Sequence, residues 1–181
     1  MPVGGLPGTG TMTMTVTRTM RRTHTVVPSP IGPLTVVRDE DGALVRLAMS
    51  PPGALEAGAL GERDDAGFED VARQLAEYFA GERTAFDLPL RPVGSPFEMA
   101  VWDQLTRIPY GETRSYGYVA EAVGEPGGAQ AVGAANGRNP IAVVVPCHRV
   151  IGADGRLVGF GGGLPRKRFL LDLEQRADRL F

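Results

Sequence analysis

The sequence predicts a chain of two parts, an α/β N-terminal half and a mostly α C-terminal half that contains a helix-turn-helix. Short apolar and β-branched runs, separated by turn residues, fill the first part. The second part holds one well-capped helix and then two short helical segments around a Gly-rich turn. The predicted division is a disordered leader (1–19), an N-terminal α/β domain (20–90), a linker (91–94) and a C-terminal domain (95–181).

The elements of the first half follow from local patterns. Gly, Pro and Thr dominate 1–19, which has no apolar face to bury and is expected to be disordered. Three short runs are typical of β-strands: Thr23–Val27, Pro33–Arg38 and Ala43–Met49. Asp39–Gly42 is a hairpin turn signal, and the Pro-, Gly- and acid-rich residues 50–65 predict a loop. Apolar residues at helical spacing predict a helix over Phe68–Ala80, and a short strand is expected near Arg83–Leu88.

The C-terminal domain begins with a clear helix start. Ser95 is a suitable N-cap, Pro96 occupies the first helical position, and Glu98 stands three residues after the cap. This helix is expected to run to about Arg107, because Pro109 and a glycine follow soon after it.

Two short helices come next. Ser115 is expected to cap a helix over Tyr116–Val123, residues 124–128 form a turn, and Ala129–Ala135 forms a second helix of small residues. This shape is typical of a helix-turn-helix, although close packing inside the protein explains it better when it is taken alone. Leu164–Leu180 predicts a final amphipathic helix.

Composition excludes several classes of protein. Cys147 is the only cysteine, so the chain has no internal disulfide and no cysteine-rich zinc cluster. With only His24 and His148 besides, no metal and no cofactor are expected. No run is apolar enough to span a bilayer, and the N-terminus lacks the apolar core of a secretory signal, so a cytoplasmic location without membrane attachment is expected.

The net charge of −2 conceals an asymmetry along the chain. Residues 1–94 carry 9 basic and 12 acidic side chains, whereas residues 107–168 carry 8 basic and 4 acidic ones. This local excess can neutralise a few phosphates, but a solvated mixed surface is the better explanation from charge alone. The basic residues concerned are Arg107, Arg114, Arg138, Arg149, Arg156, Arg166, Lys167 and Arg168.

The segment around Cys147 is the most informative part of the chain. The apolar run Ile141–Val145 is typical of a buried strand or core segment, and Pro146 then turns the backbone sharply. A lone cysteine is most often a small buried hydrophobe. Here a histidine, His148, stands beside it as a possible base, and Glu174 on the last helix is placed to orient that imidazole. These neighbours favour a nucleophilic thiol over an inert one.

Read together, these residues resemble the active-site signature of the O6-alkylguanine-DNA alkyltransferases, also called methylated-DNA–protein-cysteine methyltransferases. The signature is Asn139-Pro140-Ile-Ala-Val-Val-Val-Pro-Cys-His-Arg-Val150, and the resemblance covers about residues 95–175. Further matches at the family's spacing are Pro96-Phe97, Val101-Trp102, Ile108-Pro109, Gly111, Ser115-Tyr116-Gly117, Ala131–Asn136 and Gly161–Leu164. The first half resembles the family more loosely, through Ser29–Leu34.

The resemblance implies a ribonuclease-H-like N-terminal domain, a winged-helix-like C-terminal domain and repair by direct reversal of damage. An alkyl group on guanine O6, or less efficiently on thymine O4, moves to the thiol in a single turnover. The partner is double-stranded alkylated DNA, from which the damaged nucleotide is flipped out. A monomer is expected.

The resemblance also assigns roles to residues. The catalytic set is Cys147, His148, Glu174, Asn139 and Tyr116, with Tyr116 as the proton donor to the leaving base. The DNA-binding set is Tyr116, Gly117, Ala129, Gln130, Ala131, Gly133 and Ala134, because small residues let the second helix approach the minor groove. The substrate pocket is expected to comprise Tyr116, Val150, Phe160, Gly161 and Gly162.

Two departures from the family pattern and two rival functions complete the prediction. Gln130 stands where the family usually has an arginine that fills the gap left by the flipped base, so weaker or slower flipping is expected. A cysteine-ligated zinc site of the kind found in some N-terminal domains cannot form. The rivals are a non-catalytic lesion-binding module, as in the alkyltransferase-like proteins that lack the cysteine, and an unrelated thiol hydrolase.

Overall fold

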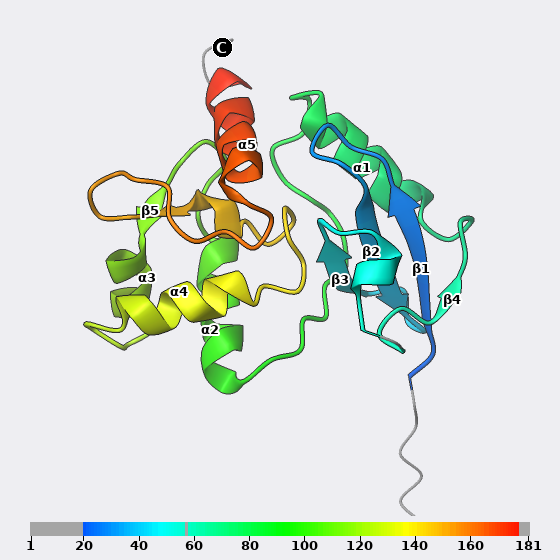
Figure 1. Cartoon of the computed structure of the whole chain (residues 1–181), viewed down its shortest axis with the longest axis horizontal. Helices are drawn as coiled ribbons and strands as arrows, with labels where there is room; N and C mark the ends of the chain where they lie inside the picture. Colours follow the sequence, from blue (N-terminus) through cyan, green and yellow to red (C-terminus); the bar gives the residue numbers. More distant parts are fainter. Residues whose placement is uncertain (1–19, 57, 178–181) are drawn as a thin grey trace, which may run out of the picture.

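The computed structural model describes residues 20–56 and 58–177, which form two parts lying side by side (Figure 1). One part is a sheet with a helix against it, and the other is a group of helices. The leader predicted for residues 1–19 and the last residues of the predicted final helix lie outside the described residues.

The N-terminal sheet has four strands in the order β3-β2-β1-β4. Its strands are β1 (Arg22–Val27), β2 (Leu34–Asp39), β3 (Leu44–Ala48) and β4 (Glu62–Arg63). β1 to β3 pair antiparallel, and β4 runs parallel to β1. The predicted hairpin turn is confirmed, with Gly42 at φ 82°. Helix α1 (Glu69–Phe79) lies against one face of the sheet (Figure 1) and buries Val71, Leu75 and Tyr78.

Two predictions in this half are wrong. Residues 50–65 are not all loop, because they contain the 3-10 helix η1 (Pro52–Ala54) and the edge strand β4. Arg83–Leu88 forms no strand. The Gln74 side chain donates to the Asp87 carbonyl (2.9 Å) and accepts from the Asp87 N–H (2.8 Å). A side-chain amide from α1 thus occupies the backbone groups that a strand partner would use.

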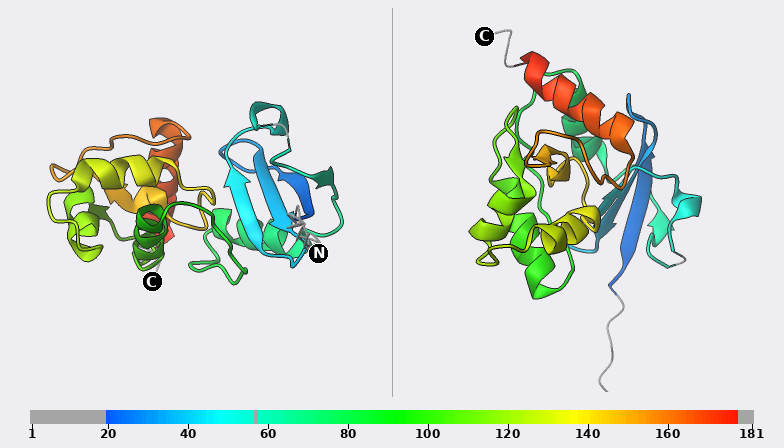
Figure 2. Two further views of the ribbon diagram at one scale, coloured as in Figure 1. Left: turned by 90° about the horizontal axis from the view of Figure 1, so that it is seen from below. Right: turned by 60° about the vertical axis from the view of Figure 1, so that its left-hand side comes forward.

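The C-terminal helices begin as the sequence predicts. Helix α2 (Pro96–Thr106) has a capping box, in which Ser95 and Glu98 each accept a backbone N–H of the other. The helix-turn-helix consists of α3 (Tyr116–Ala122), capped by Ser115, and α4 (Ala129–Gly137). The remaining elements are β5 (Arg114–Ser115), η2 (Cys147–Arg149), β6 (Val150–Ile151) and α5 (Leu164–Ala177). Helix α3 lies on the side away from the sheet (Figure 1 and Figure 2).

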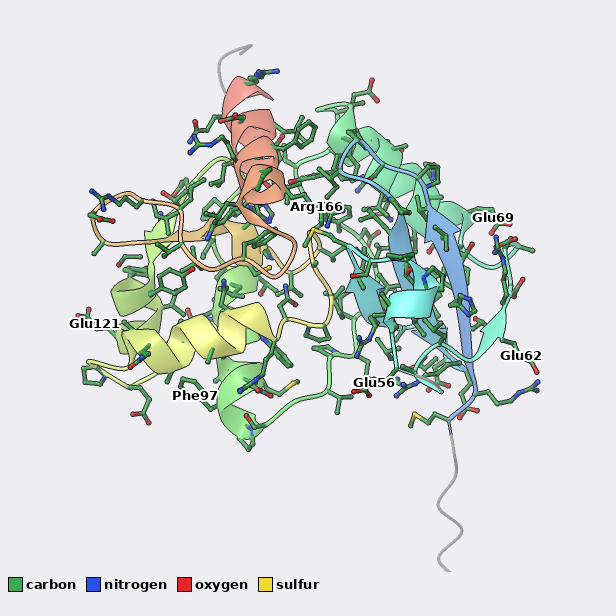
Figure 3. All side chains as sticks on the ribbon, in the orientation of Figure 1. Glu56, Glu62, Glu69, Phe97, Glu121 and Arg166 are labelled. Atoms are coloured by element: carbon green, nitrogen blue, oxygen red, sulfur yellow. The ribbon has the colours of Figure 1, made fainter. Side chains whose placement is uncertain are left out.

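The two parts share one continuous apolar core. The Leu47 N–H of β3 donates to the Pro140 carbonyl (2.9 Å), and the Ala142 N–H donates to the Leu47 carbonyl (3.0 Å). Arg166 of α5, labelled in Figure 3, donates to the carbonyl oxygens of Ile31 (2.8 Å) and Met49 (3.0 Å). The segment that leads to Cys147 is therefore held by the sheet itself. None of the helices within residues 20–56 and 58–177 is long and apolar enough to cross a membrane.

Candidate active site

Cys147 follows a buried turn rather than a strand. Ile141 makes only an isolated bridge with Leu47, and Val143 lies at φ 70°, a costly conformation for a β-branched residue. The Asn139 side chain accepts from the Ile141 N–H (3.0 Å) and donates to the Val145 carbonyl (2.8 Å). The strand expected over 141–145 is thus wrong, because one amide side chain closes this segment on itself. The expectation of a core segment is correct, since Ile141, Val143 and Val145 are buried.

A histidine–carboxylate pair begins at the residue after the cysteine. The His148 ring is completely buried, and its Nε2 lies 2.7 Å from Oε1 of Glu174 on α5. Because the carboxylate is ionised, Nε2 carries the hydrogen and donates it. The other nitrogen, Nδ1, is buried and has no hydrogen-bond partner in the described part of the chain. This tautomer leaves Nδ1 free to accept a proton.

The Glu174 carboxylate accepts hydrogen bonds from several elements. Oε1 also accepts from the Tyr78 hydroxyl (2.7 Å) and from Arg149 (2.9 Å), and Oε2 accepts from Arg149 (2.9 Å) and the Gly111 N–H (3.2 Å). Burial opposes the charge of this carboxylate, but His148 and Arg149 outweigh it and bring the pKa of Glu174 down to about 2. Glu174 is therefore a fixed negative charge at any working pH.

Burial controls the protonation of the thiol and of the imidazole. It raises the pKa of Cys147, and the Asn139 side chain and the Lys167 charge offset part of that rise. It lowers the pKa of His148, and Glu174 offsets part of that fall. The resting pair is thus a neutral thiol and a neutral imidazole.

Lys167 is a functional candidate that the sequence analysis missed. It is completely buried, and Nζ donates to the carbonyl oxygens of Val150 (2.6 Å) and Val158 (3.1 Å) and to the Tyr116 hydroxyl (3.4 Å). Burial lowers the pKa of its ammonium, and the Cys147 charge counters that effect. Its position seven residues before Glu174 was a usable signal, because two helical turns place both on one face of α5.

Tyr116, at the start of α3, reaches the same region. Its half-buried hydroxyl donates to the Val158 carbonyl (2.9 Å). Burial and then the Cys147 charge raise the pKa of this phenol, so it stays protonated and remains able to donate.

Comparisons with known proteins identify the fold and the family. Residues 23–92 match the ribonuclease-like domain of 6-O-methylguanine DNA methyltransferase, and residues 96–176 match its DNA binding domain. A methylated-DNA–protein-cysteine methyltransferase of Mycolicibacterium paratuberculosis is 52% identical over 84% of this chain and 92% of that protein. One of Methanosarcina acetivorans is 46% identical over 83% of this chain and 97% of that protein. The chain belongs to the methylated-DNA–protein-cysteine methyltransferase family.

Solved structures agree with this membership and with the predicted fold class. The Mycobacterium tuberculosis protein described as OGT in complex with DNA superposes with a TM-score of 0.80 at 48% identity, covering 86% of this chain and 94% of that one. A second structure, of Mycobacterium tuberculosis O6-methylguanine methyltransferase, gives a TM-score of 0.78 at 48% identity, with 86% and 94% covered. The predicted pairing of a ribonuclease-like domain with a helical DNA-binding domain is thereby confirmed.

A cavity of about 410 Å³ opens beside the methyltransferase cysteine. Phe160, Gly161 and Gly162, three of the predicted pocket residues, line it together with Cys147. Tyr116 and Val150 do not line it; both contact the Lys167 ammonium instead.

The two pocket glycines differ in the space beside them. A methyl group added at Gly162 would lie 2.5 Å from the Met49 side chain, whereas one at Gly161 would meet only a backbone oxygen at 3.7 Å. The space beside Gly162 is therefore filled by Met49 of the N-terminal half. The room beside Gly161 is open.

The predicted DNA-binding residues gather on the outer surface of the helix-turn-helix. Gly117, Gln130, Ala131 and Ala134 are exposed, and Ala129, Gly133 and Tyr116 are half-buried. The inner face of α4 carries the contacts that position the site: the Trp102 indole N–H donates to the Ala135 carbonyl (2.9 Å), and the Asn136 amide donates to the Cys147 carbonyl (3.2 Å). The helix that presents small residues outward is thus hydrogen-bonded to the backbone carbonyl of the cysteine.

Three of the eight basic side chains counted in residues 107–168 have their partners inside the protein. Arg149 and Lys167 are buried, and Arg166 donates to carbonyl oxygens between the two parts. A buried cation needs internal partners, and these three have them. The basic excess of residues 107–168 is therefore only partly available for phosphates, and the solvated mixed surface favoured from charge alone does not describe these three side chains. The others are half-buried or exposed: Arg107, Arg114, Arg138, Arg156 and Arg168.

Proposed function

We propose that this methyltransferase moves an alkyl group from O6 of guanine, or O4 of thymine, in double-stranded DNA to Sγ of Cys147. Family membership over most of the chain supports the reaction class. The observation that carries the assignment to this residue is the neutral His148, held by Glu174 at 2.7 Å and next in sequence to the only cysteine of the chain. An sp³ carbon is best attacked by a soft nucleophile, and a thiolate is one.

The proton and the bonds balance in one displacement. The thiol proton passes to Nδ1 of His148, directly or through a bridging water, while Sγ attacks the alkyl carbon. The C–S bond forms as the bond between that carbon and the base oxygen breaks, and the electron pair stays on the base. Glu174 stabilises the imidazolium that results. The thioether has no good leaving group, so each molecule reacts once.

Tyr116 and Lys167 are suited to the leaving base. A base that departs with an extra electron pair needs a proton, and a phenol that stays protonated supplies it. Lys167, within hydrogen-bond reach of that hydroxyl, then stabilises the phenolate. Tyr116 is thereby proposed as the proton donor, and Lys167 as its electrostatic partner.

DNA approaches over α3 and α4 in this proposal. The small exposed residues of α4 permit close contact with a groove, and Gln130 at its outer surface enters the space of the flipped nucleotide. Each molecule acts as a monomer, because one chain supplies Cys147, His148 and Glu174. It acts in the cytoplasm, since a reducing compartment keeps the lone thiol free.

Intact mass spectrometry tests this proposal. After incubation with duplex DNA that contains one O6-methylguanine, the wild-type chain should gain one methyl group in place of the thiol hydrogen. Cys147→Ser should gain none while it still binds the duplex. A lesion-binding module would never gain mass, and a thiol hydrolase would process repeated equivalents of an ester substrate. Normal methyl uptake by Cys147→Ser would contradict the assignment.

A further inference from the structure

Tyr78 connects the N-terminal half to the proposed relay. It lies on α1, is completely buried, and donates its hydroxyl hydrogen to Oε1 of Glu174 at 2.7 Å across 96 residues of sequence. The same oxygen accepts the hydrogen of His148 Nε2. Tyr78 and His148 therefore share one acceptor atom, and the carboxylate cannot rotate without breaking both bonds.

The tyrosine is itself held rigidly. The centroid of its ring lies 5.3 Å from the ring centroid of Phe79, 5.3 Å from that of Phe86 and 6.1 Å from that of Tyr110. Burial and the Glu174 charge raise the pKa of the Tyr78 phenol, so it is a neutral donor at every working pH. An aromatic side chain packed on three sides brings its hydroxyl to one place with little loss of entropy on reaction.

Four ionisable side chains of the described residues face Glu174 from the surrounding elements. They are His148 and Arg149 from η2, Tyr78 from α1, and Tyr110 from the segment after α2, whose hydroxyl is buried and finds no partner among the described residues. Tyr78 is a neutral donor to the carboxylate and is not itself the proposed base, so removal of its hydroxyl alters Glu174 without changing the net charge. Loss of its hydrogen bond concentrates negative charge on Oε1 and makes His148 more basic.

We propose that Tyr78 is a positioning residue of the transfer reaction: through Glu174 it orients His148, so that the N-terminal half takes part in activating the Cys147 thiol. This inference rests on the proposed function. Tyr78 contacts neither substrate nor sulfur. A merely structural hydrogen bond between the two halves predicts a different outcome, namely a loss of stability with an unaltered reaction.

The first test is the pH profile of single-turnover transfer by Tyr78→Phe, which removes the hydroxyl and keeps the ring. The rate at neutral pH should fall on the order of tenfold, and the acid limb should move up by about one pH unit, because a more basic His148 is protonated at higher pH. The control is Thr25→Val, which deletes a hydroxyl–carboxylate bond of the same length, 2.7 Å, from the buried Thr25 to the exposed Asp65 in the same half. Thr25→Val should keep the wild-type rate and profile.

A second variant keeps the test decisive if Tyr78→Phe folds poorly. Replacement of Tyr78 by 3-fluorotyrosine preserves the ring and strengthens the donor, so the acid limb should move to lower pH. An acid limb of the pH profile that moves up in Tyr78→Phe and down in the 3-fluorotyrosine variant would establish the positioning role. A wild-type profile in either folded variant would overturn it. Failure of the proposed function is distinguishable, because the wild-type chain would then take up no methyl group.

Discussion

The two sides of Cys147 are built in opposite ways. Behind the sulfur, the buried Glu174 accepts five hydrogen bonds. The donors are the side chains of Tyr78, His148 and Arg149, which are also buried, and the Gly111 backbone. In front lies an open cavity of about 410 Å³ whose wall includes Gly161, a residue with free space beside it. One side is a buried carboxylate saturated with donors, and the other is a cavity.

The contrast follows from what each side must do. A base is effective only if its orientation and protonation are fixed in advance, and a saturated buried carboxylate fixes both. A pocket for alkyl groups of different size needs space rather than bonds. Changes behind the sulfur should therefore alter rate, stability and pH response together, whereas changes in front should alter substrate preference and DNA binding with little effect on the fold.

The largest effect is expected for Glu174→Gln. The neutral amide keeps the shape but turns an NH₂ group toward donors, leaving Arg149 buried without its counter-charge. Single-turnover transfer should slow by about a hundredfold, and the free energy of unfolding should fall by about 2–4 kcal/mol.

Asp39→Asn is the matched control for Glu174→Gln. The Asp39 carboxylate is also buried and accepts the Asp41 and Ala43 N–H groups and an Arg91 hydrogen, but it lies at the end of β2 and, among the described residues, has no hydrogen bond to Glu174 or its donors. This variant should lose stability and keep its rate per folded molecule. Equal rates for Glu174→Gln and wild type would remove the distinction between the two sides.

The next largest effect is expected from acid, which should lower the stability that His148 and Glu174 contribute to the fold. The folded-state pKa of His148 lies below its usual 6.5, so the unfolded chain takes up a proton there as the pH falls through 6.5, and stability drops. Glu174, with a folded pKa of about 2 against 4.5, contributes stability above pH 4.5 that is lost as the pH falls toward 2. Both shifts have the same sign. The melting temperature, followed by circular dichroism, should decrease steadily below pH 6.5; a rise on acidification would be incompatible with this arrangement.

A smaller gain is expected from Gln130→Arg on the exposed surface of α4. The added charge attracts phosphate and fills the space of the flipped base more firmly, so transfer should become about threefold faster and DNA affinity should depend more steeply on salt. Gln175→Arg adds the same charge on α5, away from the helix-turn-helix, and should change neither quantity. Equal transfer rates for Gln130→Arg and wild type would mean that Gln130 does not limit flipping.

The smallest effect should come from Met49→Ala, which opens the pocket beside Gly162. The ratio of benzyl to methyl transfer rates, measured on matched duplexes, should rise by about threefold because a bulky group gains room that a methyl group does not need. Met99→Ala removes an exposed methionine on α2 and serves as control. An unchanged ratio would place the alkyl pocket elsewhere.

The sequence predicted most elements because their signals are local. The capping residues around Ser95 and Ser115, the turn at Gly42 and the spacing on α1 each depend on a few neighbouring residues. The failures involve long-range partners. Nothing near Arg83–Leu88 indicates that Gln74 will take its hydrogen bonds, and nothing near Ile141 indicates that Asn139 will close a turn.

The sequence by itself determined the family and was enough to propose the nucleophile and its base, because Cys147 and His148 are adjacent and lie in a long specific motif. Only the tertiary structure decided which charges are internal: Arg149 and Lys167 look like any basic residues until burial gives them carboxylate and carbonyl partners. It also brought Tyr78 to Glu174 and Met49 to Gly162. Such contacts join segments far apart in the chain, and only packing of the shared core sets their distances.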